Sequence, residues 1–131
     1  MRLLGIDYGE KKIGVAISDE NSKFAFPHAL LDNTSANSVL KALKIICDKN
    51  NVGKIVIGQS LDFRGQPNPI MKRVEKFKSF IEERLNIPIE YENEVLTTKQ
   101  AERAMGKSEK THSAAAALIL QAYLDRRNML K

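Results

Sequence analysis

Apolar and polar residues are arranged along the chain in blocks that predict three strands before any helix. Residues 3–8 are almost continuously apolar, as expected for a strand in the middle of a sheet. A polar turn over 9–12 separates it from a second apolar strand over 13–19, so the two should form a hairpin. A third strand is expected over 24–31, where Pro27 favours a sheet edge or a bulge.

The rest of the chain alternates helices and strands. Apolar residues that recur about every 3.6 positions identify the helices, and short apolar runs identify the strands. The predicted elements are a helix that starts at 33–35 and is closed by Gly53, a strand over 54–58, a helix over 71–85, a strand over 87–91, a helix opened by a capping box at 97–100 and a buried helix over 113–124. This order predicts an α/β fold in a single domain spanning 1–131: a mixed five-stranded sheet, with three antiparallel strands followed by alternating helices and strands, and helices on both faces.

Composition indicates an ordinary globular protein. Of the 131 residues, 43% are hydrophobic and 28% charged, which argues against intrinsic disorder. No apolar run approaches the ~20 residues that a membrane span needs, and Asp7 interrupts the N-terminal apolar stretch, which argues against a signal peptide. The single cysteine, Cys47, allows no internal disulfide and lies in an apolar helical stretch. We therefore expect a cytoplasmic protein with no membrane partner.

The charge balance suggests a polyanionic partner. The formal net charge is +5 and the isoelectric point about 9.4, which points weakly towards nucleic acid. The few aromatic residues form no series in the sequence of the kind that single-strand binders use for base stacking.

Asp7 is the first residue that the apolar pattern does not explain. It lies near the end of the first strand and is followed by Tyr8 and Gly9. An ionised group on a buried strand is costly unless it is paired or binds a metal. The alternative is that Asp7 caps the hairpin turn.

Several blocks of sequence resemble the YqgF (RuvX) family, RNase H-like proteins described as Holliday junction resolvase homologues and as nucleases for the 5′ end of pre-16S rRNA. The segment from Gly5 to Ala16 resembles the opening signature of that family. The other similar blocks, in the family's order, are 56–61 followed by Gly65, 94–98 followed by Ala101 and Glu102, and 113–125.

The resemblance implies an RNase H-like fold and a nuclease that uses two divalent ions, Mg²⁺ or Mn²⁺, held by acidic residues. Carried over residue by residue, the catalytic metal ligands are Asp7, Glu94 and His112. His112 stands where the family has an aspartate, and it could ligate only when neutral or could instead shuttle a proton. Asn93 replaces the first acid of the family's Asp-Glu-Arg block and Val95 its arginine. The alternative for His112 is an ordinary residue in the first turn of the last helix.

The predicted partner is a ribosomal RNA precursor or branched DNA, bound by a monomer or a homodimer. The basic residues placed to contact its phosphates are Lys11, Lys12, Arg64, Arg73, Lys76 and Lys99. The alternative for each of them is a solvated surface charge.

Three functions remain open from the sequence. The first is a metal-dependent nuclease. The second is a nucleic-acid-binding factor of the same fold whose metal site is weakened, which the replacements at 93, 95 and 112 suggest. The third is a nucleotide-phosphate binder of the actin and sugar-kinase type, but Glu10, Lys11 and Lys12 stand where those proteins place small hydroxyl residues.

Overall fold

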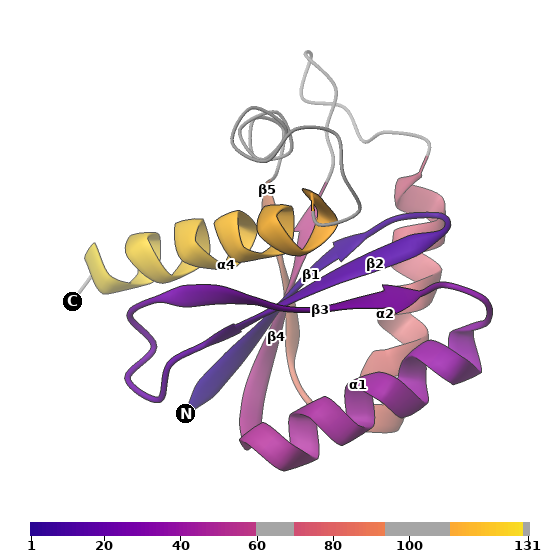
Figure 1. Cartoon of the computed structure of the whole chain (residues 1–131), viewed down its shortest axis with the longest axis horizontal. Coiled ribbons are helices and arrows are strands. Elements are labelled where there is room, and N and C mark those ends of the chain that lie inside the picture. The colour runs from indigo at the N-terminus through magenta and orange to yellow at the C-terminus, as the bar shows by residue number, and fades with distance from the viewer. Residues whose placement is uncertain (60–69, 94–110, 130–131) are drawn as a thin grey trace.

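A five-stranded mixed sheet carries helices on both of its faces (Figure 1). The computed structural model describes residues 1–59, 70–93 and 111–129. Within them lie β1 (Arg2–Tyr8), β2 (Lys12–Ser18), β3 (Ala25–Asp32), α1 (Ala36–Asn50), β4 (Val52–Gln59), α2 (Met71–Leu85), β5 (Ile89–Asn93) and α4 (Thr111–Met129). The strand order is β3-β2-β1-β4-β5; β2 is antiparallel to β1 and β3, whereas β4 and β5 run parallel to β1. The predicted α/β fold is confirmed, and the helix predicted from Thr97 lies outside the described residues.

Two apolar cores lie on opposite sides of β1, the central strand. Leu4 and Ile6 point into the larger core, which α1 and α2 close. Leu3 points the other way, into a core that α4 closes. Burial on both faces explains why β1 reads as a continuous apolar run rather than an alternating one.

Pro27 lies where its lack of an N–H group costs little. It is on β3, at the edge of the sheet, opposite a register shift between Val15 and Ala16. The sequence-based expectation of an edge or a bulge at this proline is confirmed in both respects.

Several predicted boundaries are wrong by a few residues; the last helix, for example, spans Thr111–Met129 rather than 113–124. The first helix starts after the Ser35 cap as expected, but it ends at Asn50 and is capped by Asn51 in a left-handed conformation (φ 52°); Gly53 belongs to β4. Asparagine tolerates this conformation better than most residues, so it can replace glycine as the terminating residue. The fifth strand begins at Ile89, after Pro88, and extends to Asn93.

Glycine residues let α4 approach the sheet closely. A Cβ atom at Gly5 would lie 2.8 Å from both the Ala116 carbonyl oxygen and Leu120 Cβ. A Cβ atom at Gly14 would lie 2.0 Å from the carbonyl oxygen of His112. The first turn of α4 therefore rests directly on the backbone of β2.

The described helices give no sign of a membrane crossing. None of them has both the length and the apolar character that a bilayer span demands.

Candidate active site

Asp7 and His112 form the centre of the candidate site. Asp7 is only 5% exposed and lies near the end of β1. Its Oδ2 atom is 2.9 Å from Nδ1 of His112, 105 positions later in the chain and in the first turn of α4. The carboxylate thus bonds a side chain of α4 rather than capping the hairpin turn.

Two glycines leave the space that His112 occupies. A side chain at Gly14 would collide with the His112 backbone, and a Cβ atom at Gly9 would come within 3.0 Å of its ring. These glycines are part of the block that resembles the YqgF signature. Their role here is steric: they let the imidazole lie over the end of the hairpin beside Asp7.

The polarity of the hydrogen bond follows from the groups involved. An ionised carboxylate can only accept, so Nδ1–H of His112 donates to Asp7. The hydrogen bond to Asp7 raises the pKa of His112 above its usual value, and partial burial opposes that shift. Nε2 of His112 and Oδ1 of Asp7 have no hydrogen-bond partner within the described chain, so both can face a ligand.

These two side chains suit a divalent cation in part. Because the hydrogen bond occupies Nδ1 of His112, the imidazole can offer only Nε2 to a cation, and Asp7 can offer its other oxygen, Oδ1. Among the described residues, however, no group of three His, Cys, Asp or Glu side chains could hold a metal ion. Glu94, the third predicted ligand, lies outside the described residues, as does Val95.

Glu92 is a buried acid that sequence reasoning missed. It is 7% exposed and lies on β5, two residues before Glu94. It points to the α4 face, where its Oε1 is 2.6 Å from a guanidinium nitrogen of Arg126. Ile6 of β1 pairs with Ile57 of β4, so the next residue of β1, Asp7, lies beside Gly58. Gly58 in turn pairs with Glu92 of β5. Asp7 and Glu92 therefore occupy the same row across the sheet, with only a glycine between them. The only signal for Glu92 in the sequence was its spacing of two residues from Glu90 on a half-buried strand.

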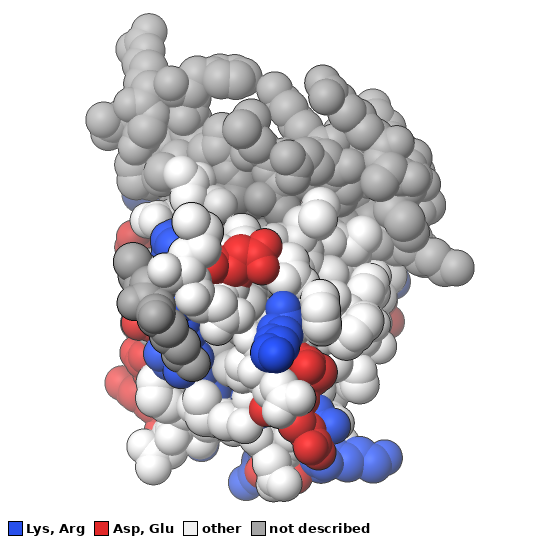
Figure 2. Space-filling model, turned by 90° about the vertical axis from the view of Figure 1, so that its left-hand side faces the viewer, with Lys and Arg blue, Asp and Glu red and all other residues white. Residues whose placement is uncertain are grey.

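The basic residues predicted to contact phosphates differ in whether they already form ion pairs within the protein. Lys11 is exposed, whereas Lys12 forms a salt bridge with Asp32 and Arg73 one of 3.7 Å with Glu10. Lys76 is exposed and makes no ion pair in the described part of the chain. Arg64 and Lys99 lie outside the described residues. On the face shown in Figure 2, positive and negative side chains are interspersed, without a continuous basic patch among the coloured residues.

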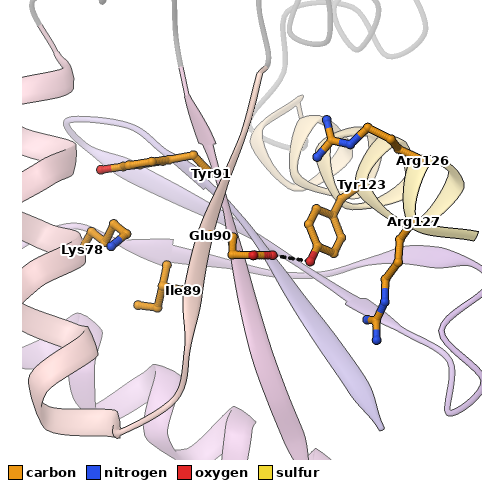
Figure 3. Close-up of a pocket in the computed structure, with 7 residues that line it drawn as sticks. All are labelled: Lys78, Ile89, Glu90, Tyr91, Tyr123, Arg126 and Arg127. Carbon is orange, nitrogen blue, oxygen red and sulfur yellow. Dashed lines mark hydrogen bonds between the residues drawn. The ribbon is translucent and has the colours of Figure 1, made fainter. Parts of the chain in front are cut away.

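A pocket of about 610 Å³ lies at the β5 edge of the sheet, between β5, α2 and the end of α4 (Figure 3). Its cationic lining residues are Lys78, Arg126 and Arg127. Lys78 is paired with Glu82 and Arg126 with Glu92, so much of this positive charge is neutralised within the protein. The pocket shares no residue with the Asp7–His112 pair.

Solved structures with a similar fold include Holliday junction resolvases. The chain superposes on Thermus thermophilus RuvC, solved in complex with a Holliday junction substrate, with a TM-score of 0.66 and 15% identity, covering 98% of this chain and 96% of that one. Fowlpox virus resolvase, solved with Holliday junction DNA, gives a TM-score of 0.57 at 15% identity and full coverage of both chains. At this level of identity, these matches establish the RNase H-like fold that the sequence predicted.

Sequence comparison gives a closer assignment. A protein from Caldanaerobacter subterraneus is 40% identical over 95% of this chain and 96% of its own length. One from Syntrophomonas wolfei is 35% identical over 95% and 94%. Both are named "Putative pre-16S rRNA nuclease". The family model described as RuvX, Holliday junction resolvase, matches residues 1–126, and the chain therefore belongs to the RuvX family.

Proposed function

We propose that this protein is a nuclease that hydrolyses phosphodiester bonds in structured nucleic acid, with the 5′ end of pre-16S rRNA as its substrate. The observation that carries the proposal is the hydrogen-bonded pair of the buried Asp7 and the half-buried His112 in a chain of the RuvX family. The names of the relatives support the RNA substrate, and the fold shared with junction resolvases makes a four-way DNA junction the comparison substrate.

Asp7 and His112 have different roles in the proposed reaction. Asp7 supplies negative charge in a buried setting and holds the His112 ring in one orientation. His112 then presents Nε2 to the reacting groups, where it can ligate or exchange a proton with the attacking water.

Mg²⁺ or Mn²⁺, held by Asp7 and His112 together with Glu94, would activate water and neutralise charge on the leaving oxygen. A nitrogen ligand favours Mn²⁺ over Mg²⁺. Activity should therefore be higher with Mn²⁺.

The test is cleavage of a 5′-extended 16S rRNA precursor and of a four-way junction, with each metal, by the wild type and by Asp7→Asn. The wild type should cut the RNA, and the variant should lose the cut. Asp48→Asn, which changes an exposed aspartate on α1, is the matched control and should remain active. Equal cleavage by Asp7→Asn would remove Asp7 from the mechanism, and cleavage of the junction alone would assign DNA as the substrate.

A second candidate function is nucleic-acid binding without cleavage. It is favoured by His112 standing where the family has an acid, because a neutral imidazole brings less negative charge to a cation site. His112→Asp separates the two: a rise in both metal affinity and cleavage would indicate a depleted native site. Metal binding by neither form, with nucleic-acid binding intact, would establish the binding factor instead.

A further inference from the structure

A second hollow opens at the same end of the sheet as Asp7, but on the side of α1 and α2. Its volume is about 310 Å³, at the lower end of the range for small-molecule sites. Three aromatic side chains line it, together with two cations and the start of α1; the residues used below are Tyr8, Phe77, Phe80, Arg73, Lys76 and Asn33.

The aromatic wall is held in place by packing. Phe77 is 5% exposed, and its ring centroid lies 5.1 Å from that of Tyr8 with an interplanar angle of 48°. Phe80 is half-buried, and the guanidinium of Arg84 lies 3.9 Å from its ring centroid. The pocket therefore has rigid, apolar ring surfaces, a site type on which a nucleobase stacks whatever its sequence.

The rim of the pocket carries positive charge that an anion could use. Lys76 is exposed and has no ion-pair partner among the described residues. Within the described ranges, the side chain of Arg73 has only the 3.7 Å contact with Glu10, and both side chains are 63% exposed. Such a solvent-exposed ion pair is weak and can yield to a phosphate.

Hydrogen bonds join this pocket to the hairpin turn next to Asp7. The side-chain amide of Asn33 donates to the carbonyl oxygen of Gly9 at 2.9 Å. The backbone N–H of Asn33 donates to the carbonyl oxygen of Lys11, also at 2.9 Å. A polynucleotide that crosses the turn could therefore place a phosphate near Asp7 and a neighbouring base near Phe80.

We propose that this pocket receives one unstacked nucleobase of the bound nucleic acid, stacked on Phe80 and Tyr8, with its phosphate held by Lys76 and Arg73. The inference rests on the proposed function and gives it a substrate preference. Taking a base out of a duplex costs stacking and pairing energy, and the cost is least where the base is already unpaired. The enzyme should therefore prefer substrates with an unpaired nucleotide beside the cleavage site.

The experiment uses an RNA duplex with a single unpaired 2-aminopurine, a base whose fluorescence is quenched when it stacks. Binding is measured in EDTA, so that no cleavage is possible. The wild type should quench the probe on binding, and Phe80→Leu should remove the quenching and weaken binding by about tenfold. Phe80→Tyr keeps the ring and should keep the quenching.

Two matched controls change similar residues elsewhere. Phe24→Leu removes an aromatic ring that is 60% exposed before β3, and Lys44→Gln removes an exposed cation on α1. Both should behave as the wild type, whereas Lys76→Gln should weaken binding. Thermal melts verify that each variant is folded.

Unchanged quenching in Phe80→Leu, or no quenching by the wild type, would overturn the proposal. The readout is independent of the proposed chemistry. If the wild type quenches the probe but does not cleave when loaded with metal, the proposed nuclease function is wrong and the base pocket is supported. If it cleaves but does not quench the probe, the base pocket is wrong and the nuclease function is supported.

Discussion

At the scale of single residues, the hydrogen bond between Asp7 and His112 couples the charge states of two side chains. The carboxylate favours the protonated imidazole and so raises the pKa of His112. Protonation of the imidazole removes the Nε2 lone pair that a metal ion would need. Asp7 therefore positions the ring but also, by favouring its protonated form, opposes metal binding to it.

The first prediction concerns this coupling in metal-free protein. Asp7→Asn should lower the pKa of His112, because the hydrogen bond to the carboxylate is the largest cause of its upward shift. NMR titration of the imidazole protons in EDTA measures the change, with His28→Gln used to assign the two histidine signals. An unchanged or higher value in Asp7→Asn would contradict the geometry described here.

Stability should follow the same coupling, with a definite sign. Because the pKa of His112 is higher in the folded than in the unfolded protein, the pair stabilises the fold fully below about pH 6.5, provided that Asp7 is ionised. The contribution disappears as the pH rises through the raised folded value. The difference in unfolding free energy between wild type and Asp7→Asn should therefore shrink from pH 6 to pH 9.

At the scale of elements, α4 is the part whose position decides whether the site forms. Its first turn lies on Gly14 of β2, and its later turns pack over Gly5 and the apolar residues of β1 and β4. On the other side of the sheet, α1 and α2 contribute apolar packing and the aromatic pocket but no group that contacts Asp7 in the described chain.

Gly14→Ala should therefore damage both stability and the site. The added methyl group would overlap the His112 backbone, and overpacking of this kind costs about 1–3 kcal/mol. Chemical denaturation measures the loss, and the pKa of His112 should fall as the ring leaves Asp7. Gly53→Ala is the control, because its methyl group would meet only the flexible side chain of Met1, and we expect a change below about 1 kcal/mol.

The contact between β5 and α4 gives another prediction. Arg126→Ala would leave the Glu92 carboxylate buried without its cation, and we expect a loss of about 1–3 kcal/mol in the free energy of unfolding. Adding Glu92→Gln to this variant removes the uncompensated charge and should restore part of the stability. A double variant no more stable than Arg126→Ala would show that the ion pair is not the source of the loss.

At the scale of the whole molecule, the net charge of +5 predicts salt-dependent binding of nucleic acid. The logarithm of the binding constant should fall linearly with the logarithm of salt concentration. Lys11→Gln should reduce that slope by about one if Lys11 contacts a phosphate. Lys41→Gln, which alters an exposed lysine of α1, should leave the slope unchanged.

The sequence predicted the order of the described elements because their apolar patterns are long and regular, as in β1 and α2. The resemblance also pointed to Asp7, through the block from Gly5 to Ala16, and to His112, through its place just before the block 113–125. It could not predict Glu92, because a glutamate on a short edge strand reads as exposed until its arginine partner is known. The aromatic pocket could not be predicted for a similar reason, because Tyr8, Asn33 and Phe80 come from three separate segments that only folding brings together.

The 105 positions between Asp7 and His112 also bear on when the protein becomes competent during its synthesis. The imidazole is added to the growing chain 105 residues after the carboxylate, so the pair cannot form until that length of chain has been synthesised. For a nuclease that acts on a ribosomal RNA precursor, this delay would keep the nascent chain harmless to the ribosome that is producing it.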